Sequence, residues 1–293
     1  MNDSTGPAGR PVAPSVGVVG AGTMGIGIAY VFAAADCPTT VVEPDTEQAK
    51  RAHEQLLERG EKARERGKLD EHRARALPER VTFVGDTAEL DEHIDLAVEA
   101  VPERSDLKTQ VLDSLERRRP RLLASNTSGL SITELSAGLQ EPARFLGLHF
   151  FNPVWSMPLV EIVVGEHTDE QTLQEARDAV ALIGKETVVV QDAPGFATSR
   201  LGVAIGLEAI RMLEQNVASA EDIDRAMELG YRHPMGPLRL TDLVGLDVRL
   251  DIARNLTAAY GDRFSPPQLL IDKVAAGELG RKSGRGFHHW SEE

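Results

Sequence analysis

The segment GAGTMG, residues 20–25, restricts the possible folds of this chain more than any other. It follows the β-branched run SVGVVG, opens the apolar stretch GIGIAYVFAAAD, and fits the pattern Gly-x-Gly-x-x-Gly. Such glycines allow a tight turn and a close approach of the backbone to a pyrophosphate, which the helix N-terminus attracts. The segment therefore predicts a dinucleotide-binding strand–turn–helix unit. The candidate cofactor contacts are Gly20, Gly22, Thr23, Met24 and Gly25.

A carboxylate follows at the end of the next strand, where dinucleotide-binding units carry an acidic residue. Glu43 ends the next strand-like run, TTVVE. A carboxylate at this place accepts hydrogen bonds from the adenosine ribose and repels a 2′-phosphate, so Glu43 favours NAD over NADP. The alternatives are a glycine-rich turn that serves only helix–strand packing, and a solvated loop acid.

Strand-like and helical runs alternate through the first 192 residues, which is typical of a parallel, doubly wound sheet. The later strand-like runs are VTFVG, IDLAVEAV, LLAS, FLGLHFF, LVEIVVG and ETVVVQD. After DAPGF, residues 192–196, only helical runs follow, among them LTDLVGLDVRLDIARNLTAAYG, expected as one helix. We predict an α/β fold: a Rossmann-type doubly wound, mostly parallel sheet followed by an all-helical C-terminal domain.

These patterns predict three parts. Residues 1–14, with their Gly, Pro and Ser content, are expected to be a disordered lead-in. Residues 15–192 form the expected NAD-binding domain, which includes a charged helical hairpin near residues 46–77. Residues 193–293 form the helical C-terminal domain.

Composition restricts the partners. The formal net charge of −14 argues against a nucleic-acid partner, because phosphate-binding faces are basic. No window approaches the roughly 20 consecutive apolar residues of a membrane helix, and the N-terminus lacks the apolar core of a secretory signal. The single cysteine, Cys37, excludes an intramolecular disulfide and fits a reducing compartment, so a cytoplasmic protein is expected. No metal site is predicted.

One imidazole lies in otherwise apolar sequence. In GLHFFNPVWSMPLVE, residues 147–161, His149 precedes the carboxylate of Glu161 by twelve positions. Two strands joined by a loop can bring these side chains together. Either they are buried polar groups that satisfy each other, or the imidazole carries a proton, as histidines do near neutral pH.

Seven segments then occur in a recognisable order: GAGTMGIGIA, LAVEAVPE, ASNTSGLSI, GLHFFNPV, DAPGFATSRL, HPMGP with DLVGLD, and GRKSGRGF. Together they resemble the 3-hydroxyacyl-CoA dehydrogenases, particularly the short bacterial 3-hydroxybutyryl-CoA and 3-hydroxyadipyl-CoA types, across residues 15–290. The resemblance implies NAD-dependent oxidation of an L-3-hydroxyacyl-CoA to the 3-oxoacyl-CoA, and the reverse, on a short acyl chain such as 3-hydroxybutyryl. It also implies a homodimer, with the C-terminal domain serving dimerisation and substrate binding.

The same resemblance implies roles for residues around the histidine. His149 is the general base that takes the proton of the 3-hydroxyl, Glu161 orients its ring, and Ser128 hydrogen-bonds the substrate oxygen. Asn152 lies near the nicotinamide and the substrate carbonyl. Judged alone, Ser128 is better explained as a helix-capping or turn serine, and Asn152 as the common turn residue before a proline.

Charged residues receive cofactor roles in the same way. Glu103 and Lys108 contact the nicotinamide-side ribose, and Lys282, in GRKSG, reaches the cofactor from the C-terminal segment. Judged alone, such residues are usually solvated.

One departure from the family's pattern concerns the substrate. Where the family has asparagine before the arginine of a Val-Asn-Arg-Leu segment, this chain has Ser199. The serine side chain is shorter than asparagine and carries a hydroxyl in place of the amide. This hydroxyl contacts the substrate directly or through water, or the substrate contact of the asparagine is lost in this chain.

A second departure concerns the hairpin, which reads RGEKARERGKL where the family carries apolar residues over CoA. Arg66 is the nearest match to a CoA-contacting lysine and is a candidate substrate contact. The alternative is a solvated helix face, with Glu58 paired to Lys62 and Glu61 paired to Arg64.

Two other functions stay open at this point. The same hydride chemistry could act on a carrier-protein-bound hydroxyacyl group or on a free hydroxy or sugar acid. A non-catalytic NAD-binding protein is the other alternative, since folds are reused without their chemistry.

Overall fold

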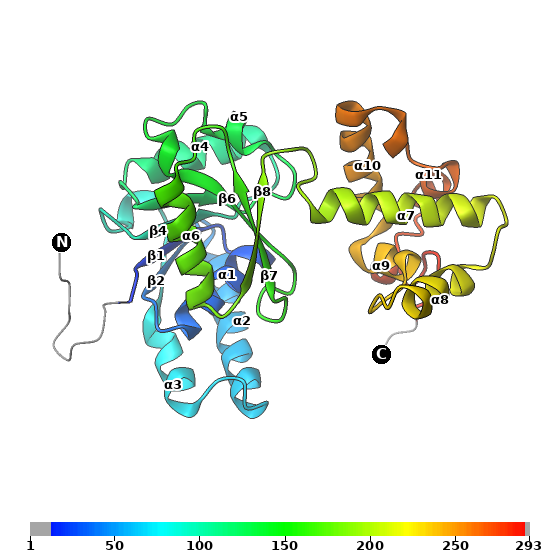
Figure 1. Ribbon diagram of the computed structural model, residues 1–293. Helices are drawn as coiled ribbons and strands as arrows, with labels where there is room; N and C mark the ends of the chain where they lie inside the picture. The colour runs from blue at the N-terminus through cyan, green and yellow to red at the C-terminus, as the bar shows by residue number, and fades with distance from the viewer. Residues whose placement is uncertain (1–12, 291–293) are drawn as a thin grey trace. The chain divides into compact units, whose positions relative to one another are not determined.

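The computed structural model describes residues 13–290, so most of the predicted disordered lead-in lies outside the described residues. The chain divides into two compact units, Met1–Asp192 and Ala193–Glu293 (Figure 1). Each unit has its own hydrophobic core.

The first unit is built on one eight-stranded sheet, counted over its described residues, with the order β3-β2-β1-β4-β5-β6-β7-β8. Neighbouring strands are parallel except for β6 and β7, which are antiparallel. The strands are β1 Val16–Val19, β2 Thr39–Val42, β3 Val81–Val84, β4 Leu96–Glu99, β5 Leu122–Ser125, β6 Phe145–Phe150, β7 Leu159–Val164 and β8 Glu186–Gln191. The predicted doubly wound, mostly parallel sheet with a helical C-terminal part is confirmed.

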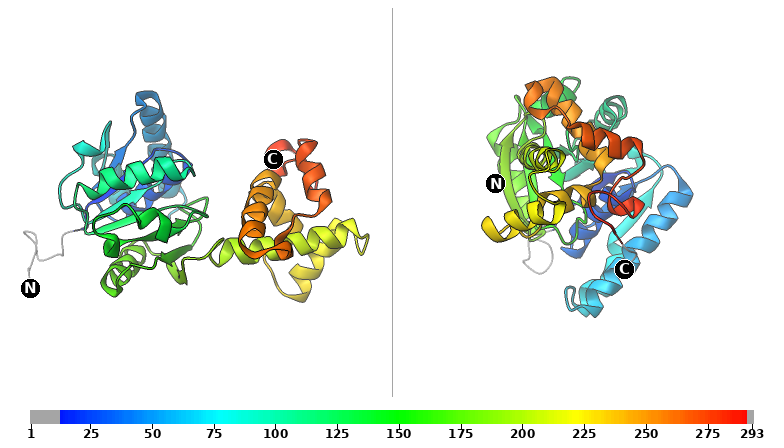
Figure 2. Two further views of the ribbon diagram at one scale, coloured as in Figure 1. Left: turned by 90° about the horizontal axis from the view of Figure 1, so that it is seen from above. Right: turned by 90° about the vertical axis from the view of Figure 1, so that its right-hand side faces the viewer.

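Helices cover both faces of this sheet (Figure 2). They are α1 Thr23–Ala34, α2 Thr46–Glu65, α3 Glu71–Arg80, α4 Ser105–Glu116, α5 Ile132–Ser136 and α6 Glu170–Leu182. The run from Gly25 to Ala33 in α1 is buried on all sides, because this helix packs against the central strands while α2 and α3 cover it. Central strands such as β1 and β4 are likewise buried throughout, as expected for parallel strands covered on both faces.

The hairpin of α2 and α3 is closely packed at its base and charged along its exposed face. Gly60 allows the two helices to approach, since a Cβ there would lie 2.6 Å from a methyl carbon of Leu77. On the outer face, Lys62 pairs with Glu58 and Arg64 pairs with Glu61. The ion pairs of the solvated-face alternative therefore form.

The second unit is helical in its described part. Its helices are α7 Thr198–Glu214, α8 Ala220–Gly230, α9 Pro237–Val244, α10 Leu246–Tyr260 and α11 Gln268–Ala275. The expectation of one continuous helix over LTDLVGLDVRLDIARNLTAAYG is wrong, because the chain breaks at Gly245. Its φ of 104° is a conformation that a right-handed helix does not contain and that glycine adopts readily.

Two smaller observations complete the fold. Cys37 is fully buried, and burial raises the pKa of its thiol to about 11, so it acts as an apolar packing group. Over residues 13–290 no helix is both long and apolar enough to cross a membrane.

Candidate active site

His149 and Glu161 lie opposite each other on the antiparallel strands β6 and β7. The imidazole Nδ1 is 2.8 Å from Oε2 of Glu161. The histidine is 7% exposed and the glutamate 0%. An ionised carboxylate can only accept, so beside it Nδ1 carries the ring proton and Nε2 keeps its lone pair.

The surroundings of His149 fix the end of strand β6. The imidazole packs against Phe151, with ring centroids 4.4 Å apart. The Oδ1 atom of Asn126 accepts a hydrogen bond of 2.9 Å from the backbone N–H of Phe150, which ties the loop after β5 to β6. Both strand ends are thus held at the carboxyl edge of the parallel strands, where doubly wound sheets place their ligand sites.

The loop that carries Ser128 is organised by Glu103. Oε1 of Glu103 accepts hydrogen bonds from the Thr127 hydroxyl at 2.6 Å, from the Ser128 N–H at 2.9 Å and from the Gly129 N–H at 3.1 Å. It also accepts from the Ser128 hydroxyl at 3.2 Å. Ser128 itself is exposed, so its side chain is available to a ligand.

Glu103 is ionised over a wide pH range for a physical reason. Burial alone would raise the pKa of its carboxyl, but the hydrogen bonds from Thr127 and Ser128 and the charge of Lys108 lower it below the usual range. At neutral pH this carboxylate is therefore ionised and accepts the hydrogen bonds that hold the Ser128 loop.

Lys108 is enclosed rather than open to a ligand. It is 1% exposed, and its Nζ donates to both oxygens of Glu99 at 2.8 and 3.0 Å and lies 3.3 Å from Glu103. The structure therefore brings the two predicted ribose contacts together, with Glu103 the more accessible and Lys108 as its support.

Glu99 and Ser125 are parts of this site that the sequence analysis did not single out. The Ser125 hydroxyl donates to Glu99, which is fully buried at the end of β4. The available signal was the carboxylate within the buried strand run IDLAVEAV, because a buried carboxylate requires a partner.

The glycine loop has the geometry of a nucleotide cradle. Gly20, at φ 101°, passes close to strand β4, and a Cβ on Gly25 would lie 1.8 Å from the Gly20 carbonyl oxygen. By contrast, a Cβ on Gly22 would meet no protein atom within 4 Å. Gly22 caps α1 without a side-chain hydrogen bond, so the N-terminus of this helix is presented to open space.

Glu43 stands beside this loop at the end of β2. Its carboxylate accepts hydrogen bonds from the backbone N–H groups of Ala21 at 3.0 Å and Asp45 at 3.1 Å. A cavity of about 670 Å³ extends over the loop. Its lining includes Gly20, Gly22, Thr23, Met24, Glu43, Asp86, Val101 and Leu107. Apolar walls, a helix N-terminus and a carboxylate at the end of the second strand fit an adenine dinucleotide.

Two other predicted contacts of this unit are exposed. Asn152 lies in the loop between β6 and β7, and Arg66 follows the last turn of α2. Arg66 lines a groove of about 670 Å³ together with Trp155, whose ring stacks under the guanidinium of Arg59 at 3.5 Å. This arginine–tryptophan stack was not expected from the sequence, because the two residues are far apart in the chain.

Ser199 and Lys282 belong to the second unit. Ser199 is half-buried in the first turn of α7. Lys282 is half-exposed, and its Nζ lies 2.6 Å from Oδ2 of Asp247 at the start of α10. The segment that carries Lys282 is tied down by Asp242, which accepts hydrogen bonds from the N–H groups of Phe287 and His288.

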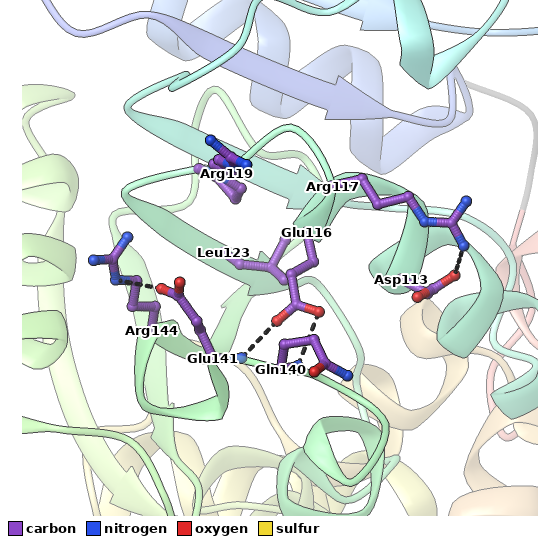
Figure 3. Close-up of a pocket in the computed structure, with 9 residues that line it drawn as sticks. Asp113, Glu116, Arg117, Arg119, Leu123, Gln140, Glu141 and Arg144 are labelled. Carbon is purple, nitrogen blue, oxygen red and sulfur yellow. Dashed lines mark hydrogen bonds and ion pairs between the residues drawn. The ribbon is translucent and has the colours of Figure 1, made fainter.

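A separate hollow of about 400 Å³ lies at the opposite, amino edge of strands β5 and β6 (Figure 3). Two ion pairs lie in its wall: Arg117 pairs with Asp113, and Arg144 pairs with Glu141. Glu116 accepts hydrogen bonds from the backbone N–H groups of Gln140 and Glu141. None of the predicted site residues lines this hollow. Among residues 13–290, no three His, Cys, Asp or Glu side chains gather as a metal site.

Comparison with protein families gives two matches that together span both units. The family "3-hydroxyacyl-CoA dehydrogenase, NAD binding domain" matches residues 15–193, and the family "3-hydroxyacyl-CoA dehydrogenase, C-terminal domain" matches residues 195–290. The predicted NAD cofactor is thereby confirmed.

Individual proteins are similar over nearly their whole length. The 3-hydroxybutyryl-CoA dehydrogenase of Mycobacterium tuberculosis is 43% identical over 279 residues, which cover 93% of this chain and 97% of that protein. The 3-hydroxybutyryl-CoA dehydrogenase of Bradyrhizobium diazoefficiens is 37% identical over 287 residues, 95% and 96% of the two chains. The crystal structure of (S)-3-hydroxybutyryl-CoA dehydrogenase from Ralstonia eutropha superposes with a TM-score of 0.90 at 34% identity, covering 96% and 100% of the two chains.

Proposed function

This chain belongs to the 3-hydroxyacyl-CoA dehydrogenase family and is an NAD-dependent oxidoreductase, and from that premise we propose that His149 moves the proton in the oxidation of a short L-3-hydroxyacyl-CoA. The buried pair of His149 and Glu161, 2.8 Å apart beside the carboxyl edge of the sheet, carries the proposal. The short acyl chain is inferred from similar proteins named for 3-hydroxybutyryl-CoA.

In the oxidation, Nε2 of His149 takes the proton of the 3-hydroxyl. NAD, held at the glycine loop, would supply the acceptor for the hydride that leaves C3. The imidazole becomes a cation in this step, and the adjacent Glu161 carboxylate stabilises that charge while it keeps Nδ1 protonated. In the reverse direction the imidazolium returns the proton to the 3-oxo oxygen.

Ser128 and Asn152 position the substrate in this proposal. Ser128 is exposed on a loop that Glu103 holds through several hydrogen bonds, so its hydroxyl is offered in a fixed place. Asn152 is exposed three residues after His149, where its amide can donate to a carbonyl oxygen. Preorganised donors of this kind act on the oxygen that gains or loses charge.

The remaining predicted residues bind the cofactor or the CoA and acyl parts of the substrate. Gly20, Gly22, Thr23 and Met24 hold the pyrophosphate, Gly25 supports their turn, and Glu43 selects the ribose without a 2′-phosphate. Glu103, which Lys108 supports, and Lys282 contact the nicotinamide half of NAD. Arg66 binds the anionic end of CoA, and Ser199 contacts the acyl part of the substrate.

We further propose a cytoplasmic homodimer. Apolar side chains are exposed on α7, α9 and α10, three helices that pack on one another. They are Leu201, Ile205, Leu240, Leu243, Val244 and Val248. An exposed apolar surface of this kind is typical of a protein interface.

The test compares the wild-type chain with His149→Gln. We expect the purified protein to consume NADH when acetoacetyl-CoA is added, and the variant to be slower by about 100- to 10,000-fold, the usual contribution of a general acid–base. Titration of NADH fluorescence should give similar affinities for both proteins. Full activity in the variant would remove His149 from the mechanism.

Free acetoacetate and a carrier-protein-bound acetoacetyl group are tested in the same assay. NADH consumption with either of these, and none with the CoA ester, would replace the CoA assignment. NADH binding without consumption of any of the three would favour the non-catalytic alternative.

A further inference from the structure

Lys185 lies between helix α6 and strand β8 and donates hydrogen bonds to two backbone carbonyls. Its Nζ is 2.6 Å from the carbonyl oxygen of Val154 and 2.6 Å from that of Met157. The side chain is half-buried, and burial lowers the pKa of its ammonium. Among the residues that the structure describes, no carboxylate offsets this effect. A cation removed from water usually faces a carboxylate, so its use on two carbonyls points to a role for the segment that carries them.

The two carbonyls belong to the loop that joins β6 to β7 and carries Asn152. Within this loop, the N–H groups of Ser156 and Met157 both donate to the Pro153 carbonyl at 3.0 Å, which closes a tight turn. Lys185 binds carbonyls within and at the end of the same turn. Hydrogen bonds from a charged donor are stronger than those between neutral groups, so Lys185 holds the turn in one conformation.

Two further contacts join this loop to helices α1 and α2. Val154 is 1% exposed, and it packs so closely on α1 that a Cβ on Gly27 would lie 2.7 Å from its own Cβ. The ring of Trp155 lies under the guanidinium of Arg59, on α2, at 3.5 Å. The loop is therefore attached to the helix that begins at the cofactor-binding glycines. Asn152, one residue before the turn, is exposed.

We propose that Lys185 is a positioning residue for the reaction, which holds the turn so that the amide of Asn152 is directed at the substrate carbonyl. The inference rests on the proposed function, which gives Asn152 its contact with substrate. Lys185 lines neither the cavity over the glycine loop nor the groove beside Trp155, so it acts through the loop alone. A donor displaced by about 1 Å can lower a rate about 100-fold.

The experiment measures kcat and KM for NADH-dependent reduction of acetoacetyl-CoA, and NADH affinity by fluorescence titration. Lys185→Met should lower kcat about 10- to 100-fold and leave NADH affinity within about twofold of the wild type, because the glycine loop is untouched. Lys185→Arg should recover most of the rate, since a guanidinium also donates to two acceptors. The control Glu186→Gln alters the exposed neighbouring side chain and should behave as the wild type.

A double-mutant cycle with Asn152→Ala separates positioning from a merely structural role. If Lys185 acts through Asn152, adding Lys185→Met to Asn152→Ala should lower kcat by less than about threefold further. An equal loss in both backgrounds would overturn the proposal, because Lys185 would then act independently of Asn152. If Lys185→Met does not fold, the cycle is run with Lys185→Gln, which keeps an uncharged donor.

Two other results would also overturn the proposal. One is a wild-type kcat in Lys185→Met, and the other is a loss of NADH affinity as large as the loss of kcat. Each of them would leave the proposed function standing, because the wild type still reduces acetoacetyl-CoA. A wild type that reduces neither acetoacetyl-CoA nor the free or carrier-bound acetoacetyl group would refute both.

Discussion

Glu161 lies directly across the strand pair from His149, and its Oε2 is 2.8 Å from the imidazole Nδ1. Both side chains are buried in an otherwise apolar stretch of sheet. The backbone pairing of β6 with β7 therefore fixes the imidazole in place before any ligand binds. If His149 carries the proton, as proposed, its ring does not have to be turned into position by the ligand.

Replacing Glu161 by glutamine tests whether its charge serves the reaction. The amide oxygen still accepts a hydrogen bond from Nδ1, but it does not stabilise the imidazolium. We expect kcat with acetoacetyl-CoA to fall about 100-fold or more, as for other carboxylate–histidine pairs. The matched control is Glu166→Gln, an exposed carboxylate just beyond β7. A kcat within threefold of the wild type would make the pair purely structural.

Gly22 and Gly25 should respond differently to alanine. A Cβ on Gly22 would meet no protein atom, whereas a Cβ on Gly25 would lie 1.8 Å from the Gly20 carbonyl oxygen. Gly22→Ala should therefore keep its melting temperature but bind NADH about 10-fold or more weakly, since it intrudes on the pyrophosphate. Gly25→Ala should lower the melting temperature itself. Calorimetry and a fluorescence titration measure both effects, and identical behaviour of the two variants would contradict this division.

The low pKa of Glu103 predicts that Glu103→Gln is less stable than the wild type at neutral pH but equally stable in acid. The pKa of its carboxyl is lower in the folded chain than its ordinary value of 4.5. The unfolded chain therefore binds this proton first as the pH falls, so the stabilisation is complete above pH 4.5 and is lost through the folded pKa below it. Glu103→Gln should melt below the wild type at pH 7, and the two melting curves should converge below pH 4.5. If the difference in melting temperature stays constant down to pH 3, the charge of Glu103 does not contribute to stability.

The exposed apolar residues of the second unit predict a dimer. Leu201 is 63% exposed on α7, with Ile205 one turn further on. We expect the wild type to elute at twice 31.8 kDa and Leu201→Glu to elute as a monomer of 31.8 kDa, because a buried charge disrupts an apolar interface. Leu182→Glu, at an exposed apolar residue of α6 in the first unit, is the control. A monomeric wild type would refute the interface.

Local patterns predicted the elements of this fold well. All eight strand-like runs of the first unit are strands, because short apolar runs bounded by turn residues favour the extended conformation. The Ser219 hydroxyl accepts a hydrogen bond from the Asp222 N–H, as its place before an acidic first turn suggests. The break at Gly245 was not predictable from the same patterns, since apolar periodicity continues through it while φ changes sign.

Partners across the fold were harder to predict than elements. The burial of Lys108 depends on Glu99 and Glu103, which lie on two sides of a strand end, and no local spacing reports such a cluster. Arg249, 4% exposed on α10 and with no hydrogen-bond partner for its Nε, is likewise buried by residues distant in sequence, Gly202 and Gly206 of α7. The opposition of His149 and Glu161 was predictable because the two residues lie on consecutive strands joined by a short loop.

The antiparallel pairing of β6 with β7 has a consequence for how this enzyme can diversify. A deletion of one residue within either strand would rotate every later side chain of that strand to the other face of the sheet and separate His149 from Glu161. Insertions into the connecting loop, residues 151–158, leave the pairing of the strands unchanged. A change of length within β6 or β7 is thus expected to separate His149 from Glu161, whereas a change of length in the loop between them is not.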